Sequence, residues 1–205
     1  MQHSSQRQAH RFTFCNTFGP NGGVPSSSMT IESQLAAPQA SGITDNARKE
    51  IVVYLAGPIT GLSYEQTIGW RTELQRRFSD TAPHVRCLDP MRAKDHLAGF
   101  DNIGAFGHPG GLLDGKAVVS RDLWDVARAD VVLMNLSGAE TISIGCMVEL
   151  GWARAQNKFV VVVLPLEERR GGDGTSNPHD HLFVLEVASA VVDDLPTAAS
   201  IIESM

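Results

Sequence analysis

The sequence predicts an α/β fold, in which a doubly wound parallel β-sheet of about five strands carries helices on both faces as a three-layer sandwich. Three observations predict it. Short apolar runs rich in β-branched residues alternate along the chain with segments of helical periodicity. Runs such as IVVYLAG and FVVVVLP are apolar throughout, which is typical of parallel strands buried on both faces. Several of these runs end in glycine or proline, where a strand stops.

The first half of the predicted domain contains two strands, one helix and one long loop. Ile51–Gly57 and Val85–Pro90 are the apolar runs that we expect to form strands. Between them, apolar side chains recur at helical spacing, which predicts a helix over Tyr64–Phe78; these are Trp70, Leu74 and Phe78. Residues 91–113 are rich in glycine. A loop of this length in a compact domain is usually functional.

The second half continues the alternation and ends with a short strand and a helix. We expect, in order, a helix, a strand, a helix and a strand at Asp114–Arg128, Val131–Leu136, Ile144–Gln156 and Phe159–Pro165. Val119, Leu123 and Val126 lie on one stripe of the first of these helices, so we expect that stripe to be buried. A charged, glycine-rich loop follows at 167–178, and Pro196 lies in the first turn of the last helix.

The first 48 residues differ from the rest of the chain. They are rich in Ser, Gln, Gly and Pro, lack periodicity, and contain no acidic residue before Glu32. We expect a disordered leader at 1–48 and one domain at 49–205. An acid-poor leader also resembles an organelle transit peptide. An untargeted tail, or a start codon placed too early with Met29 as the true start, is the interpretation that we prefer.

The composition argues against several classes of protein. A net charge of −6 does not favour general affinity for polymeric nucleic acid. No apolar run approaches the roughly 20 residues that span a bilayer. The three cysteines, Cys15, Cys87 and Cys146, form no CxxC pair and are too scattered for a disulfide framework. We therefore expect a cytoplasmic protein that acts on a small molecule.

The candidate chemistry lies beyond the carboxyl ends of the strands, where ligands bind in folds of this kind. The first strand runs into YLAGPITG, in which Gly57 and Pro58 open the turn. Glycine here allows a close approach between the backbone and a ligand. The spacing is not GxGxxG, so no dinucleotide cofactor is predicted. A tight turn that binds nothing is the alternative.

Two carboxylates occupy positions where a charge is costly unless it is used. Asp122 borders the apolar stripe of its helix, whereas a solvated helix face suits Asp125 and Arg128 better. Glu149 lies in SIGCMVELGWARA, in the second turn of a helix that Ser143 is placed to cap. Local pairing of Glu149 is the alternative to catalysis, and spacing alone does not separate the two.

Taken together, YLAGP, RDL…ADVVL and S.G…ELG.A followed by an apolar strand resemble the nucleoside 2-deoxyribosyltransferase family. The motifs occur in the family's order, and the likeness covers 51–202. The resemblance implies a flavodoxin-like fold and cleavage of the N-glycosidic bond of nucleosides or nucleotides. It implies free nucleobases as second substrates, and a homodimer or higher homo-oligomer in which a neighbour completes the pocket. A carboxylate nucleophile needs no metal, and we expect no cofactor.

The resemblance also implies a role for three residues. Glu149 matches the nucleophile that attacks the anomeric carbon and forms a glycosyl-enzyme intermediate. Tyr54 matches a tyrosine that holds this glutamate, and Asp122 matches an aspartate that contacts the base and helps to protonate it. Cleavage through an oxocarbenium-like state needs negative charge below the sugar and a proton donor for the departing base. Two carboxylates in different surroundings can supply both.

Five further positions are expected to contact substrate: Gly57, Pro58, Ser143, Gly145 and His181. His181, together with His179, belongs to NPHDHLF, where the neighbour's contribution is expected. The HxH pair also suggests a metal, but no third ligand is evident, so a surface loop is preferred.

The chain departs from the family at Ser143, where transferases often carry aspartate. Serine there resembles the branch that hydrolyses nucleoside 5′-monophosphates, in which it binds phosphate. That branch has serine and arginine in the first loop, where this chain has Pro58 and Thr60. Three arginines are candidates to take over the phosphate contact, and the sequence does not choose among them: Arg71, Arg92 and Arg121.

Three functions therefore stay open, in order of preference. The first is transfer of 2-deoxyribose between nucleobases, and the second is hydrolysis of nucleoside 5′-monophosphates. The third is a nucleotide-binding module without turnover, since fold does not determine function. A phosphoribohydrolase of the lysine-decarboxylase-like type is suggested by HPGG at His108–Gly111 but is discounted, because Glu149 lies far downstream of it.

Overall fold

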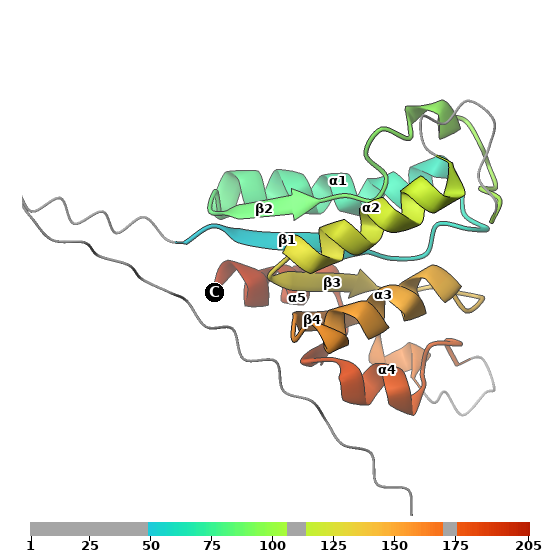
Figure 1. Cartoon of the computed structure of the whole chain (residues 1–205). Helices are drawn as coiled ribbons and strands as arrows, with labels where there is room; N and C mark the ends of the chain where they lie inside the picture. Colours follow the sequence, from blue (N-terminus) through green and yellow to red (C-terminus); the bar gives the residue numbers. More distant parts are fainter. Residues whose placement is uncertain (1–48, 106–113, 170–175) are drawn as a thin grey trace, which may run out of the picture. The chain divides into compact units, whose positions relative to one another are not determined.

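Five parallel strands form one sheet in the order β2-β1-β3-β4-β5 in the computed structural model (Figure 1). Their bounds are Ile51–Ala56 for β1, Val85–Leu88 for β2, Val131–Asn135 for β3, Phe159–Val163 for β4 and Ala190–Val192 for β5. The structure describes residues 49–105, 114–169 and 176–205. The expected leader at 1–48 and the HPGG segment lie outside them, so the domain boundary stays a prediction.

Helices cover both faces of this sheet, as the sequence predicted (Figure 1). The helices are α1 Tyr64–Thr81, α2 Gly115–Arg128, α3 Ile144–Ala155, α4 Leu182–Val187 and α5 Leu195–Glu203. α1 and α5 pack on one face through a core that includes Leu74, Phe78 and Ile202. α2, α3 and α4 pack on the other face. The strand order is that of flavodoxin-like folds, in which the ligand crevice opens between β1 and β3.

Side chains alternate along β1, and this alternation decides which of them face α2 and α3. Val53 and Leu55 belong to the core shared with α1 and α5, whereas Val52 and Tyr54 belong to the core shared with α2 and α3. Successive strand residues point to opposite faces, so Tyr54 lies on the same side of the sheet as α3.

The segment after β2 folds over the start of α1 rather than forming an open loop. Met91, Leu97 and Ile103 form a small buried cluster, to which Leu97 contributes from the short 3-10 helix Asp95–Leu97. Backbone bonds join this segment to the first turn: Gly61 N–H donates to the Ile103 carbonyl at 2.9 Å, and Ile103 N–H donates to the Leu62 carbonyl at 2.9 Å. Part of the predicted long loop is therefore a packed cover at the carboxyl end of the sheet.

The buried stripe predicted on α2 is wrong at two of its three positions. Val126 is fully buried, but Val119 is 55% and Leu123 is 39% exposed. The two exposed residues come before the last turns of α2, and only those last turns contribute a residue, Val126, to the core between the sheet and α2, α3 and α4. Asp125, expected on a solvated face, is fully buried between the guanidinium groups of Arg92 and Arg128. The sequence therefore predicted this helix correctly, but it did not predict which side chains of the helix are buried.

The helix α4 was not predicted, because its first two residues were assigned to the NPHDHLF loop and the other four to no element. Its sequence, LFVLEV, is apolar at almost every position and is too short to show a helical period. No helix among residues 49–105, 114–169 and 176–205 is long and apolar enough to cross a membrane.

Packing of α1 should depend on apolar contact far more than on its surface ion pair. Phe78 is 1% exposed, and its neighbour Arg77 forms two bonds of 2.8 Å to Glu203 on α5. We expect Phe78→Ala to lower the free energy of unfolding by about 3–5 kcal/mol. Arg77→Ala should lower it by about 1 kcal/mol or less. Urea denaturation of both variants measures this, and equal losses would contradict the packing described here.

Candidate active site

The centre of the candidate site is a hydrogen bond between a strand and a helix. The hydroxyl of Tyr54 in β1 donates to Oε1 of Glu149 in α3 at 2.6 Å. Tyr54 is fully buried, and burial followed by the nearby Glu149 carboxylate raises its pKa well above the usual value. The phenol therefore stays protonated and donates. The predicted pairing of these two residues, which are 95 positions apart, is present.

Glu149 is a carboxylate whose surroundings disfavour its charge. Burial raises its pKa to about 7, and repulsion from Asp122 adds to this effect. The Tyr54 hydrogen bond, together with the positive charges of Arg71 and Lys94, opposes the rise. At neutral pH this group is thus divided between its ionised and protonated forms.

Asp122 lies close enough to Glu149 for their charges to interact. Its side chain is 14% exposed, and Oδ1 accepts hydrogen bonds of 3.2 and 3.0 Å from Arg121. Burial raises the pKa of Asp122, and Arg121 and Lys94 counteract part of that rise. Oδ2 has no hydrogen-bond partner within the described segments, so it can serve a ligand.

The helix that carries Glu149 begins where the sequence predicted, at Ser143. The Ser143 hydroxyl accepts from Cys146 N–H at 3.3 Å, which caps α3. The Ser143 N–H in turn donates to Nε2 of His179 at 2.9 Å. Asn177 Oδ1 lies 3.1 Å from Nδ1 of the same ring, so the ring carries its proton on Nδ1. Burial lowers the pKa of His179, which keeps this acceptor neutral.

The residues around His179 hold the whole turn between β3 and α3. Asn177 Nδ2 donates to the Leu136 carbonyl at 2.7 Å, and both oxygens of Glu168 accept from Gly138 N–H, at 3.0 and 2.9 Å. His179 was expected to touch substrate, but within one chain it positions Ser143. Gly145 is exposed at the start of α3, next to Ser143. Its predicted contact with substrate stays a prediction.

Gly57 is required by packing at the end of β1. A Cβ atom there would lie 2.9 Å from Trp70 and 3.0 Å from the Asn135 carbonyl, so no larger residue fits. Its own carbonyl accepts from Arg71 Nη2 at 3.1 Å. Pro58 follows and is half-buried. Close approach to neighbouring chain segments explains this glycine, and contact of Gly57 and Pro58 with a ligand stays a prediction.

The three arginines considered for a phosphate site are all engaged elsewhere. Arg71 is fully buried and donates to the carbonyls of three residues, namely Leu55, Gly57 and Thr67. Arg121 donates to the Pro90 carbonyl at 2.7 Å and to Asp122. Arg92 pairs with Asp125 and donates to the Asp89 carbonyl at 2.9 Å. These cations fasten the loops of the site to one another.

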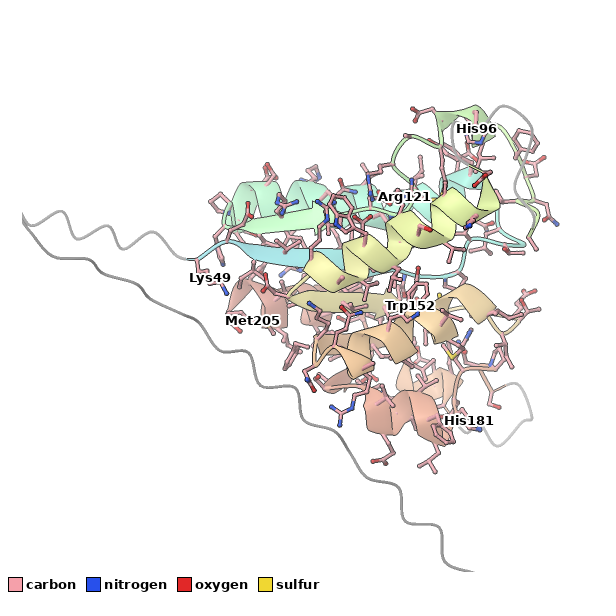
Figure 2. The ribbon with its side chains drawn as sticks, viewed as in Figure 1. Lys49, His96, Arg121, Trp152, His181 and Met205 are labelled. Carbon is pink, nitrogen blue, oxygen red and sulfur yellow. The ribbon has the colours of Figure 1, made fainter. Side chains whose placement is uncertain are left out.

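The side chain of His181 has no hydrogen bond to another candidate site residue within the described parts of the chain. It caps α4, is exposed, and stacks on Phe183 with ring centroids 5.8 Å apart. Figure 2 shows His181 beside α4 and well away from Arg121, the neighbour of Asp122. Its predicted substrate contact stays a prediction. Within the described ranges, no group of three His, Cys, Asp or Glu side chains could hold a metal ion.

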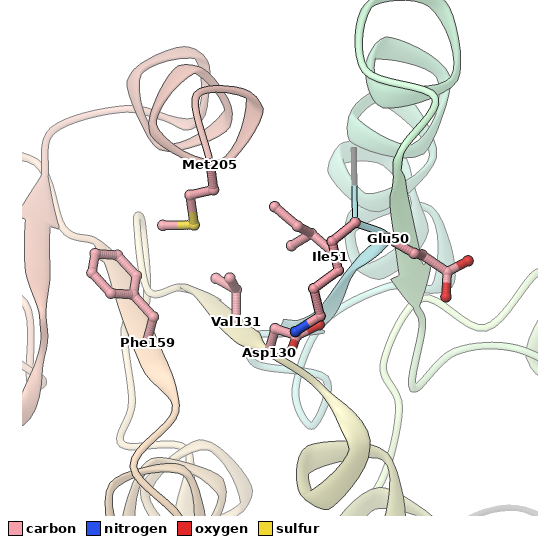
Figure 3. A pocket seen from close by; sticks show the side chains of 7 residues that line it. Glu50, Ile51, Asp130, Val131, Phe159 and Met205 are labelled. Atoms are coloured by element: carbon pink, nitrogen blue, oxygen red, sulfur yellow. The ribbon is translucent and has the colours of Figure 1, made fainter. Parts of the chain in front are cut away.

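A hollow of about 380 Å³, shown in Figure 3, lies where the strands begin. Its lining includes the first residues of three strands, which are Ile51, Val131 and Phe159. The charged residues of its lining are Lys49, Glu50 and Asp130. The carboxyl end of the sheet holds Glu149 and Asp122, two partly buried carboxylates whose pKa values are raised, so chemistry rather than volume locates the candidate site.

Comparisons with known proteins identify the family and agree with the fold. Residues 53–182 match the sequence model of the nucleoside 2-deoxyribosyltransferase family. No curated protein matches the chain. A conserved protein from Enterococcus faecalis V583 has a similar structure, with a TM-score of 0.56 and 18% identity over 75% of this chain and 98% of that one. The corresponding values for a 2-desoxiribosyltransferase from Leishmania mexicana are 0.49, 16%, 75% and 97%. The matched range contains Tyr54, Asp122 and Glu149.

Replacing Glu149 by glutamine should change how stability depends on pH. The folded pKa of about 7 exceeds the ordinary value of 4.5, so the stability that protonated Glu149 contributes is lost as pH rises through that window. Glutamine has no proton to lose. We expect Glu149→Gln to be more stable than wild type at about pH 8, by roughly 1–3 kcal/mol, with little difference at about pH 4.

Urea denaturation of both proteins across this pH range measures the effect. Glu140→Gln, at an exposed position in the preceding loop, is the matched control and should follow the wild-type curve. Parallel curves for wild type and Glu149→Gln would show that Glu149 titrates normally.

Proposed function

The chain belongs to the nucleoside 2-deoxyribosyltransferase family, and on this premise we propose that it cleaves the N-glycosidic bond of 2′-deoxynucleosides and transfers the sugar to a second nucleobase. The observation that carries the proposal is the Tyr54–Glu149 hydrogen bond beside Asp122. It places a held carboxylate and a second carboxylate of raised pKa at the end of the sheet where ligands bind.

Glu149 acts as the nucleophile in this proposal. Tyr54 binds Oε1 only, and Oε2 has no hydrogen-bond partner among the described residues. An oxygen in that state can attack the anomeric carbon while the other stays fixed. The geometry lowers the entropy cost of the attack, because rotation of the carboxylate is already restricted.

Asp122 supplies the proton that the departing base needs. Its raised pKa favours the protonated form more than in an ordinary aspartate, and Arg121 holds one oxygen in place. As the bond from C1′ to the base nitrogen breaks, its electron pair moves to the base and the proton of Asp122 follows. Glu149 then carries the sugar as an ester, which a second base or water resolves.

Hydrolysis of nucleoside 5′-monophosphates is the second candidate function. Ser143 at the start of α3 favours it, because the first N–H groups of a twelve-residue helix suit an anion. The commitment of Arg71, Arg92 and Arg121 to other groups argues against a phosphate site built from them. Transfer is therefore the preferred function, and a binding module without turnover would leave the raised pKa values of both carboxylates unused.

Turnover is tested with deoxyadenosine, deoxyinosine and their 5′-monophosphates, each with and without a second free base, with chromatography of the products. We expect a new nucleoside only when the acceptor base is present. Glu149→Ala should reduce the rate by at least about 1,000-fold while the protein stays folded. Free base and sugar phosphate from the monophosphates alone would establish the hydrolase instead. Undiminished turnover in folded Glu149→Ala would exclude Glu149 as the nucleophile.

The apolar residues exposed on α2 and α3 support a homo-oligomer. Val119 and Leu123 on α2 and Ile144 and Val148 on α3 are between 39% and 77% exposed, and the two helices are neighbours on the same face of the sheet (Figure 1). Exposed apolar residues gathered in this way mark an interaction surface. A second copy of the chain is the occupant that family membership favours, and the proposed contact of His181 with substrate would come from that copy.

Light scattering after size-exclusion chromatography tests the oligomer. We expect the wild type to be at least dimeric and Val148→Arg to shift it to monomer, because burial of an unpaired charge opposes association. Thr72→Arg on α1, at an exposed position on the opposite face of the sheet, is the control and should leave the mass unchanged. A monomeric wild type, or a dimer that Val148→Arg leaves intact, would contradict this assembly.

A further inference from the structure

Lys94 is a half-buried cation that the sequence did not single out. It follows Ala93, whose φ of 58° is unusual for a residue with a side chain, and precedes the 3-10 helix Asp95–Leu97. Arg121 ties this segment to α2, since its guanidinium donates to the carbonyls of Pro90 at 2.7 Å and Arg92 at 3.3 Å. The segment therefore passes directly beside the residue that precedes Asp122.

The Lys94 ammonium has no hydrogen bond or ion pair with any residue in the described parts of the chain. This distinguishes it from the surrounding arginines, Arg71, Arg92 and Arg121, each of which is bound to carbonyls or carboxylates. Burial lowers the pKa of Lys94, whereas the negative charges of Asp122 and Glu149 raise it. A half-buried ammonium without a partner is costly, and a ligand that accepts its hydrogen bonds would remove that cost.

The position of Lys94 relative to the two carboxylates indicates which part of a ligand it meets. Arg121 donates both to the carbonyls of Pro90 and Arg92, which lead into Lys94, and to Oδ1 of Asp122, so the segment of Lys94 lies on the Asp122 side of the site. In the proposed function Asp122 serves the base and Glu149 serves the sugar. An ammonium has three donors and no acceptor, so it recognises an acceptor atom on the base.

We propose that Lys94 is a specificity-determining residue that binds a ring carbonyl oxygen of the nucleobase and so selects oxo-bases over bases that carry an amino group at that position. This inference rests on the proposed function of the same site. When the bond from C1′ to the base breaks, its electron pair spreads onto the ring and the carbonyl oxygen becomes more negative. The ammonium stabilises that charge, while the proton from Asp122 goes to a ring nitrogen.

Deoxyinosine and deoxyadenosine form a matched pair of substrates, because they share the sugar and the leaving nitrogen but differ in the oxygen or amino group at the six position. The test compares kcat/KM for both in wild type and in Lys94→Met, which keeps the length of the side chain and removes its charge. We expect a loss of about 10- to 100-fold with deoxyinosine and less than about 3-fold with deoxyadenosine.

Two further variants control this test. Lys158→Met removes another half-buried lysine, which donates to the Ala127 carbonyl, at the opposite end of the sheet, and should leave the ratio between the two substrates unchanged. Lys94→Arg restores a charge and should recover part of the deoxyinosine activity. Equal losses with both substrates, or a loss confined to 5′-monophosphates whatever the base, would overturn the proposal.

Binding of free bases separates failure of this inference from failure of the proposed function. Calorimetric titration with hypoxanthine and adenine needs no turnover. If the wild type cleaves nothing but binds hypoxanthine at least about 10-fold more tightly than Lys94→Met does, the proposed function fails and the role of Lys94 stands. If Lys94→Met binds both bases as the wild type does, the role of Lys94 is wrong, whether or not the wild type is active.

Discussion

The site depends on the hydrogen bond between the Tyr54 hydroxyl and Oε1 of Glu149. This bond joins the middle of the sheet to the second turn of α3, and it partly offsets the cost of keeping a carboxylate in partly buried surroundings. Two conditions make it possible. Tyr54 must point to the α3 face, which the alternation of β1 ensures, and α3 must begin at Ser143 so that Glu149 reaches the phenol.

The charges around this bond fall into two groups with different tasks. Arginines hold the structure: Arg71 fastens the end of β1, Arg121 fastens the segment after β2 to α2, and Arg92 and Arg128 neutralise buried Asp125. Glu149, Asp122 and Lys94 make few or no such contacts, and all three have pKa values shifted by burial. Groups whose burial is not fully compensated within the protein are the ones suited to bind and convert a ligand.

The sequence was most informative where a structural element leaves a clear pattern of residue types. Apolar β-branched runs predicted β1 to β4 within two residues of their observed ends, and every α-helix except α4 was predicted. Tyr54, Asp122 and Glu149 were selected by motif and do meet at one end of the sheet. The failures have physical reasons as well. α4 is too short to show a helical period, and α2 exposes Val119 and Leu123 because burial depends on what covers a helix rather than on its period.

By itself, then, the sequence determined the layered α/β class, because side-chain alternation and helical period are local properties of the chain. The pairing of Tyr54 with Glu149 was expected only from the family resemblance. Only the tertiary structure decided that His179 supports Ser143, that the three arginines are committed to loops, and that Lys94 is left facing the carboxylates. Hydrogen-bond partners and burial arise between segments distant along the chain, and the letters of a loop do not reveal which charges the folded protein leaves without a partner.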